Sequence, residues 1–225
     1  MRTSMKKAAL IVALALAAGR VFAADMTEEQ KTLYAAGQWL ARQAAVFHLS
    51  PAELDPVVQG LRDGVTGAPS AVDLGVYSAK LQQLADERQA AAAKKAESEG
   101  RDLLARAAAE KGAVKGFGGL VYLSLREGSG AAPKATDVVT VNYRGMLPDG
   151  KEFDSSYKRG KPAEFPLDGV IKCWTEGLQK MKVGGKARLV CPPETAYGEQ
   201  GRGGVIPPNA TLVFEVELLG VKSQK

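Results

Sequence analysis

Apolar residues follow two different periodicities along the chain, one typical of helices and the other typical of strands. Between Met26 and Lys111 they recur every three or four positions, which places them on one face of a helix. This spacing predicts three helices, whose apolar or small faces are Leu33, Gly37, Leu40, Ala44 and Phe47, then Leu54, Val57, Val58 and Leu61, then Leu74, Tyr77, Leu81 and Leu84.

Each predicted helix begins at a capping signal. The first opens at Thr27-Glu28-Glu29-Gln30 and the second at Ser50-Pro51-Ala52-Glu53, and both match a capping box. The third begins at Ser70, and the second is expected to end near Gly64. After Leu84 the third helix loses its apolar face, because Asp86 to Lys111 is mostly alanine and charge.

The pattern therefore predicts one long helix from Ser70 to about Lys111, roughly 60 Å in length at 1.5 Å per residue. Its second half is expected to be a solvated rod, stabilised by helix propensity and by pairs such as Glu97 with Arg101. Gly100 is the residue at which this rod is expected to bend.

From Gly116 onward, apolar and polar residues alternate, which is typical of strands with one buried face. One short helix is expected from Trp174 to Met181, ended by Gly184-Gly185. The fold class is therefore α+β, with an antiparallel sheet wrapped around one short helix. The expected strands are Leu120 to Arg126, the alternation at Val139, Val141 and Tyr143, Glu164 to Leu167, Lys186 to Cys191 and the alternation from Leu212 to Leu218.

The helical faces lie within about 60 residues and make a small core, marginal on its own. Gly37 and Ala44 would let another helix approach closely, so we expect this module to form a homodimer; the alternative is a monomeric three-helix bundle. The predicted divisions are a signal peptide at 1–23, a helical dimerisation module at 26–66, a connecting helix at 70–112 and a β-rich domain at 116–225.

The first 23 residues have the three parts of an export signal. Arg2, Lys6 and Lys7 precede an apolar run from Ala8 to Ala18, and the small-residue sequence Val21-Phe22-Ala23 follows. The apolar run is too short to span a bilayer, which disfavours the alternative of a retained membrane anchor. We therefore expect export to the periplasm, with the outer-membrane surface or secretion as other destinations, and no membrane span after cleavage.

The signal accounts for most of the formal net charge of +5. Its removal leaves 26 of the 30 basic residues against 25 acidic ones. A chain so close to neutral has no broad positive field for a phosphate backbone, so we do not expect a nucleic-acid partner.

Two cysteines and one histidine limit the possible chemistry. Cys173 and Cys191 are too far apart for a CxxC motif, and with only His48 they cannot complete a tetrahedral zinc site. Export would place them where a disulfide persists, so a structural bridge is favoured over two buried free thiols. We find no phosphate loop, no HExxH motif and no histidine to activate a serine.

A set of aromatic residues beside one acid remains after these exclusions. Five motifs contain them: Val141-Asn142-Tyr143-Arg144-Gly145, Phe153-Asp154-Ser155-Ser156, Gly169-Val170-Ile171-Lys172-Cys173-Trp174, Thr195-Ala196-Tyr197-Gly198 and the segment from Ile206 to Phe214. Over residues 118 to 222 these motifs resemble, in the same order, the FKBP family of peptidyl-prolyl cis–trans isomerases. The helical arm and long helix resemble the exported Mip and FkpA-like members in layout and composition.

The resemblance implies a proline-binding pocket and assigns a role to each residue. Trp174 would form its floor, Asp154 and Tyr197 its polar edge, and the backbone N–H of Ile171 would meet a substrate carbonyl. Arg159 would pair with Asp154. The walls would be Tyr143, Phe153, Val170, Ile171 and Phe214, and Val205 and Ile206 would lie on an overhanging loop.

Two positions depart from the family pattern. Ala163 stands where many members have a second aromatic residue, so that wall of the pocket is expected to be lower. Lys172-Cys173 replaces the Pro-Gly that commonly precedes the tryptophan in Mip-like members. A bridge from Cys173 to Cys191 would hold the pocket floor rigid.

The implied function is isomerisation of X-Pro bonds in exported proteins, and it needs no cofactor, metal or nucleophile. An apolar pocket favours the twisted amide over the more polar planar one. The implied partners are unfolded or partly folded polypeptides that contain proline, and inhibitors would be FK-type macrolides. The alternatives are a holdase-type periplasmic chaperone and a secreted interaction or virulence factor, each with incidental isomerase activity.

Overall fold

The computed structural model describes residues 25–223, so the predicted signal peptide at 1–23 lies outside the described residues. The chain divides into two compact units, one ending at Leu40 and the other beginning at Ala41. Within residues 25–223, none of the helices combines the length and the apolar character that crossing a bilayer requires.

In the described part of the chain, the main element of the first unit is helix α1 (Glu28–Gln43), which belongs to it up to Leu40. Its N-terminus forms the expected capping box, in which the backbone N–H of Thr27 donates to Gln30 Oε1 at 2.9 Å and the N–H of Gln30 donates to Thr27 Oγ1 at 3.2 Å. None of the residues of α1 is buried, although the helix carries Leu33, Tyr34, Trp39 and Leu40.

The second unit begins with short helical elements that precede a long helix. They are η2 (Ala44–Phe47), η3 (Pro51–Glu53) and α2 (Leu54–Thr66). Helix α2 ends two residues later than expected, because Gly67 adopts a left-handed φ of 70° and caps it in place of Gly64. Arg88 of the long helix joins these elements, donating to Phe47 O at 2.7 Å and pairing with Glu53.

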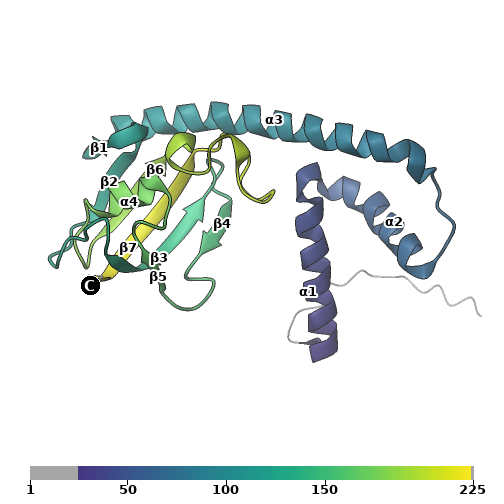
Figure 1. Ribbon diagram of the computed structural model, residues 1–225, viewed down its shortest axis with the longest axis horizontal. Helices are drawn as coiled ribbons and strands as arrows, with labels where there is room; N and C mark the ends of the chain where they lie inside the picture. The colour runs from purple at the N-terminus through teal and green to yellow at the C-terminus, as the bar shows by residue number, and fades with distance from the viewer. Residues whose placement is uncertain (1–24, 224–225) are drawn as a thin grey trace, which may run out of the picture. The chain divides into compact units, whose positions relative to one another are not determined.

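The long helix α3 (Leu74–Ala109) starts where the side chain of Asp73 accepts bonds from the N–H groups of Gly75 and Val76. Figure 1 shows α3 as one continuous helix whose second half lies along the sheet. Ala96, Gly100 and Ala107 are buried there. The expectations of a solvated rod and of a bend at Gly100 are therefore wrong, because these small residues let the helix backbone pack closely on the sheet module.

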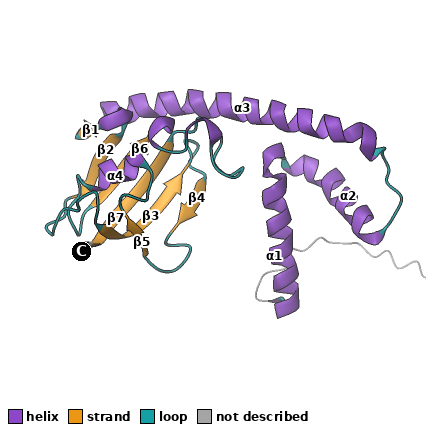
Figure 2. Ribbon diagram, viewed as in Figure 1, coloured by secondary structure: helices purple, strands orange, loops and turns teal. Residues whose placement is uncertain are grey.

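The strands form one antiparallel sheet, drawn as orange arrows in Figure 2, with strand order β1-β2-β6-β7-β3-β4 and with β5 paired to β3. Strands β1 and β4 were not expected from the sequence. The strands are β1 (Ala113–Lys115), β2 (Val121–Arg126), β3 (Val138–Met146), β4 (Glu152–Ser155), β5 (Ala163–Pro166), β6 (Lys186–Cys191) and β7 (Leu212–Lys222).

One short helix, α4 (Lys172–Leu178), packs against the sheet, as predicted. Leu178 of the helix and Leu189, Leu212 and Val216 of the sheet are fully buried in the core between them. The α+β class, with a sheet around one helix, is confirmed. The alternation of apolar residues determined this arrangement, since each inward position of β3, β6 and β7 is buried.

Candidate functional site

A cavity of about 470 Å³ opens where β3, β4, β5 and β7 meet the start of α4. Aromatic and aliphatic side chains make up most of its wall. The lining residues are Tyr143, Phe153, Asp154, Phe165, Gly169, Val170, Ile171, Trp174, Tyr197, Arg202 and Phe214.

Trp174 lines this cavity and is 4% exposed. Its indole meets three other rings edge-to-face, with centroid distances of 5.0 Å to Tyr143, 5.3 Å to Phe214 and 5.6 Å to Phe165. Edge-to-face pairs are each worth about 0.5–1.5 kcal/mol beyond their buried area. The rings therefore hold one another in place and form a rigid apolar surface.

A glycine allows two of the wall rings to meet. Phe214 of β7 pairs in register with Gly145 of β3. A Cβ atom on Gly145 would lie 2.7 Å from Phe153 Cζ and 2.9 Å from Phe214 Cε1. Because Gly145 has no side chain, the rings of Phe153 and Phe214 approach to 5.7 Å and close one wall of the cavity.

Asp154 is held at the cavity edge by three donors. The Tyr143 hydroxyl and the Arg159 guanidinium both donate to its carboxylate, and the N–H of Ser155 donates at 2.8 Å. Arg159 also donates to the Tyr143 hydroxyl at 2.8 Å. The sequence-predicted partners Asp154 and Arg159 are thus in contact, and Tyr143 joins them into one polar triad.

This triad shifts the pKa of both acidic groups. Burial raises the pKa of Asp154, but the hydrogen bonds from Tyr143 and Arg159 and the charge of Arg159 outweigh burial, so its pKa is lower than usual. Burial, together with the hydrogen bond to Asp154, raises the pKa of Tyr143 to about 12. Near neutral pH the site therefore holds a carboxylate beside a neutral phenol.

Two lining side chains were not among those expected, those of Phe165 and Arg202, and Gly169 also lines the cavity without a side chain. Phe165 belongs to β5 and lies two residues after Ala163, so both point to the same face of the strand. Ala163 is packed against the core without lining the cavity, and Phe165 supplies an aromatic wall from the same strand. The alternation within β5 was the sequence signal that could have identified Phe165.

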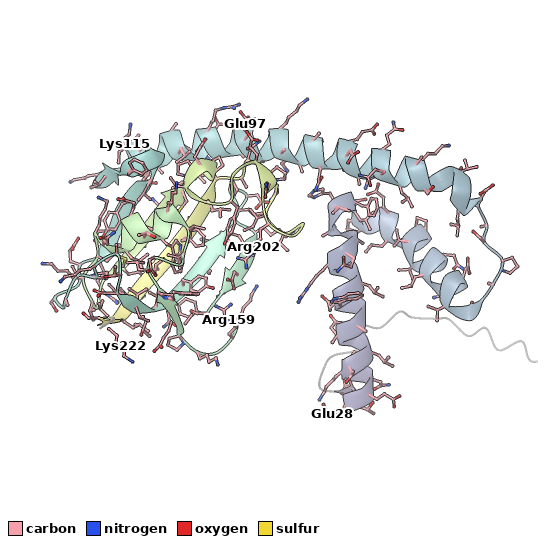
Figure 3. The ribbon with its side chains drawn as sticks, viewed as in Figure 1. Glu28, Glu97, Lys115, Arg159, Arg202 and Lys222 are labelled. Atoms are coloured by element: carbon pink, nitrogen blue, oxygen red, sulfur yellow. A yellow bond between two sulfur atoms is a disulfide. The ribbon has the colours of Figure 1, made fainter. Side chains whose placement is uncertain are left out.

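Arg202 is the second unexpected residue. Its Nη1 donates to the Tyr197 hydroxyl at 2.9 Å, and its guanidinium carbon lies 5.4 Å from the Tyr197 ring centroid. Figure 3 shows Arg202 and Arg159 on the same flank of the sheet module. A lone arginine in a glycine-rich loop carried no sequence signal for this position.

Val205 and Ile206, expected on an overhanging loop, belong to the loop that carries Arg202, and neither is among the residues that line the cavity. Ile206 is 3% exposed and belongs to the core, and Val205 is 43% exposed and lies outside the cavity wall. The expectation that they contact a substrate stays a prediction. Ile206 exchanges two backbone hydrogen bonds with Arg202, which ties the loop to the core.

Cys173 and Cys191 form a disulfide with a Cα–Cα distance of 5.7 Å, and both are fully buried. The bridge joins the first turn of α4 to the end of β6, directly beside Trp174. Within the described residues 25–223, no group of three or more His, Cys, Asp or Glu side chains could hold a metal ion. The cavity is thus built to receive an apolar ring next to a fixed carboxylate.

Two family descriptions match the chain. Residues 130–219 match "FKBP-type peptidyl-prolyl cis-trans isomerase", and residues 29–123 match "Domain amino terminal to FKBP-type peptidyl-prolyl isomerase". Together the two matches span the long helix and the sheet that carries the cavity.

Similar proteins carry the same description. The "FKBP-type peptidyl-prolyl cis-trans isomerase FkpA" of Escherichia coli strain K12 is 42% identical over 89% of this chain and 78% of its own length. A "Probable FKBP-type peptidyl-prolyl cis-trans isomerase" of Haemophilus influenzae is 42% identical over 97% of this chain and 96% of its own. The crystal structure of FkpA from Escherichia coli matches with a TM-score of 0.63 and 41% identity, over 88% of this chain and 98% of that one.

Proposed function

The chain belongs to the FKBP-type peptidyl-prolyl cis–trans isomerase family, and on that premise we propose that X-Pro peptide bonds rotate in the cavity above Trp174. The observation that carries this assignment is the aromatic cavity itself, which Trp174 lines and whose walls include Tyr143, Phe153 and Phe214. A proline ring is apolar and flat enough to rest on such a surface.

Rotation about an X-Pro bond requires no covalent step. The barrier is about 20 kcal/mol because the amide loses its resonance at the twisted geometry. The planar amide carries more charge on oxygen than the twisted one, so an apolar cavity disfavours the ground state relative to the transition state. An acceleration of a thousand- to a millionfold needs only about 4 to 8 kcal/mol, which ring contacts and one hydrogen bond can supply.

We assign the substrate hydrogen bond to the backbone N–H of Ile171. This residue directly precedes α4, and its carbonyl accepts from the N–H groups of Trp174 and Thr175. Within residues 25–223, its own N–H donates to no backbone or side-chain acceptor. It is therefore a fixed donor at the wall of the cavity, and Val170 beside it adds apolar surface.

Asp154 acts electrostatically in this proposal and not as a general base. Its carboxylate is already bonded to Tyr143 and Arg159, and its pKa is lower than usual, so it does not take up a proton near neutral pH. Its charge holds the Tyr143 hydroxyl and the Arg159 guanidinium in place at the edge of the cavity. Tyr197 supplies a second polar group at the rim.

The test is an exchange NMR assay of the full chain with an N-acetylated Ala-Leu-Pro-Phe amide. We expect faster cis–trans exchange than without protein, and a loss of that acceleration when an FK-type macrolide is added. Absence of any acceleration by the folded protein would overturn the assignment. Refolding of a proline-limited protein and aggregation of a proline-free one separate isomerase from holdase activity, since an isomerase assists only the first.

We also propose that the exported chain is a homodimer that assists the folding of exported proteins. Apolar side chains of the arm are exposed in the single chain, among them Leu33 at 65%, Trp39 at 59% and Leu61 at 50%. Such a set of apolar residues is typical of a surface covered by another chain. The boundaries proposed for the parts are those expected from the sequence: 1–23, 26–66, 70–112 and 116–225.

The periplasm is the proposed destination, because residues 1–23 have the pattern of an export signal. Proline-containing unfolded chains are the proposed clients. The holdase and the secreted interaction factor remain alternatives that the relatives' names do not favour.

A further inference from the structure

Arg202 occupies a defined position at the rim of the cavity. Its backbone forms an isolated bridge with Ile206, in which its N–H donates to Ile206 O at 2.9 Å and its O accepts from the Ile206 N–H at 3.1 Å. The N–H of Val205 also donates to Arg202 O, at 3.0 Å. Three backbone hydrogen bonds thus hold the residue that carries the guanidinium.

The surrounding sequence makes this tight loop possible. A Cβ atom on Gly201 would lie 2.2 Å from Ile206 O, and Gly201 has a φ of 61°. Gly203 and Gly204 also have positive φ values, of 53° and 68°. Ile206 is buried beneath the loop. The loop is therefore anchored from below, and its one charged side chain lies against Tyr197.

The charge of Arg202 is not neutralised within the described chain. None of the ion pairs found in residues 25–223 includes it. Asp154, the acidic residue among those that line the cavity, is paired with Arg159. The rim therefore carries one excess positive charge beside an otherwise apolar cavity.

We propose that Arg202 selects substrates with a carboxylate side chain directly beside the proline. This inference rests on the proposed function of the same cavity. One N–H of the guanidinium is used by Tyr197, which leaves donors on the other nitrogens for a carboxylate. The stacking over Tyr197 holds the planar group in one orientation, so less freedom is lost when an acidic side chain binds.

The expected size of the effect follows from the exposure of the site. Arg202 is exposed to solvent, so a single charge pair changes kcat/KM by about two- to fivefold. The effect decreases as ionic strength rises, because salt screens an exposed pair. A preference of this size is a specificity contribution and leaves the isomerisation chemistry to the aromatic cavity.

The experiment measures kcat/KM of the full chain by exchange NMR with N-acetylated Ala-X-Pro-Phe amides, where X is Glu, Gln or Lys. A second set, Ala-Ala-Pro-X, places the same side chains after the proline. The readout is the ratio of kcat/KM for Glu to that for Gln, and for Glu to that for Lys. At low salt we expect both ratios to be about 2 to 5 in at least one peptide set.

Three variants separate the role of Arg202 from general effects. In Arg202→Gln the ratios fall to about one, and Arg202→Lys retains part of the preference because it keeps the charge but loses the planar fork. Lys115→Gln removes a positive charge from β1, the strand at the opposite end of the sheet order from β4, and should keep the wild-type ratios (Figure 3).

The outcomes distinguish this inference from the proposed function. If the wild-type chain isomerises all peptides with kcat/KM ratios near one, the selection of acidic substrates is overturned and the isomerase assignment is left intact. The same holds if Arg202→Gln leaves the ratios unchanged. If no peptide is isomerised by the wild-type chain, the proposed function itself fails.

Discussion

Gly100 of α3 lies directly against Thr211, the residue before β7. A Cβ atom at Gly100 would come within 2.3 Å of Thr211 Oγ1 and 2.8 Å of Thr211 Cβ, and Thr211 is itself 2% exposed. The missing side chain lets the helix backbone contact the sheet module. Gly100, which was expected to weaken the helix, thus fixes the point at which α3 contacts the sheet module.

The first prediction is that Gly100→Ala destabilises the protein by about 1–3 kcal/mol, because overpacking of a buried contact outweighs the gain in helix propensity. Denaturant unfolding of the full chain measures the change. Gly64→Ala is the matched control, since a Cβ atom there would meet nothing within 4 Å, and it should be neutral or stabilising. Equal effects of the two substitutions would contradict the close packing of α3 on Thr211.

The second prediction concerns the indole in the cavity wall. Trp174→Phe should lower kcat/KM for prolyl isomerisation by about tenfold, the equivalent of about 1.4 kcal/mol, because a smaller ring weakens the edge-to-face contacts with Tyr143 and Phe214. The exchange NMR assay measures it. Phe117→Leu, at an aromatic residue that is 69% exposed and outside the cavity, should stay within about twofold of wild type. Full activity of Trp174→Phe would argue against proline binding on the indole.

The third prediction is a flat pH profile of isomerisation between about pH 5 and 9. The pKa of Asp154 is below its ordinary 3.8, so the contribution of its carboxylate is complete above that pH and is lost as the pH falls through the lowered pKa. The pKa of Tyr143 is raised from its ordinary value of 10.0 to about 12, so the phenol stays neutral until the pH approaches 12. An inflection of kcat/KM near neutral pH would show that another group takes part.

A variant tests the cause of the acid limit. Arg159→Gln removes the charge and a hydrogen bond that lower the pKa of Asp154. The acid limb of the pH profile should then move to higher pH, while an unchanged limb would assign it to another group. Lys158→Gln, whose ion pair is with Glu152, is the matched control and should leave the limb in place.

The fourth prediction is that loss of the disulfide lowers stability without removing the fold. In a chain-entropy account, closing a loop of this length is worth about 3 kcal/mol. The double variant Cys173→Ala with Cys191→Ala should lose about that free energy of unfolding, measured in denaturant. Thiol titration of the denatured, unreduced wild-type chain should find no free thiol, since both cysteines are in the bridge. Two free thiols would contradict the bridge.

The fifth prediction addresses the arm. Leu33→Glu together with Leu61→Glu should halve the mass measured by sedimentation, because charges on the exposed apolar faces prevent a second chain from packing there. Leu219→Glu, at a residue of β7 that is 38% exposed, should leave the mass unchanged. A wild-type chain that sediments as a monomer would refute the homodimer.

Local signals were sufficient for the helices and for the main strands. The reciprocal bonds between Thr27 and Gln30 are contacts between near neighbours in sequence, so residue type and spacing reveal them. The long helix was predicted with its start at Ser70, but it begins at Leu74 with Asp73 as its cap. Alternation revealed β3, β6 and β7, because burial on one face imposes a period of two. The short strands β1 and β4 were not predicted, since burial does not alternate along either of them.

The amino-acid order by itself determined the helical arm, the alternating strands, the export pattern and the aromatic motifs, because each depends on nearby residues or on a family-specific set of side chains. Only the tertiary structure decided that Gly100 attaches the helix, that Phe165 completes the wall and that Arg202, not Val205 or Ile206, reaches the rim. These three depend on contacts between segments distant in sequence. Periodicity records which face of an element is buried, and it carries no information about what that face meets.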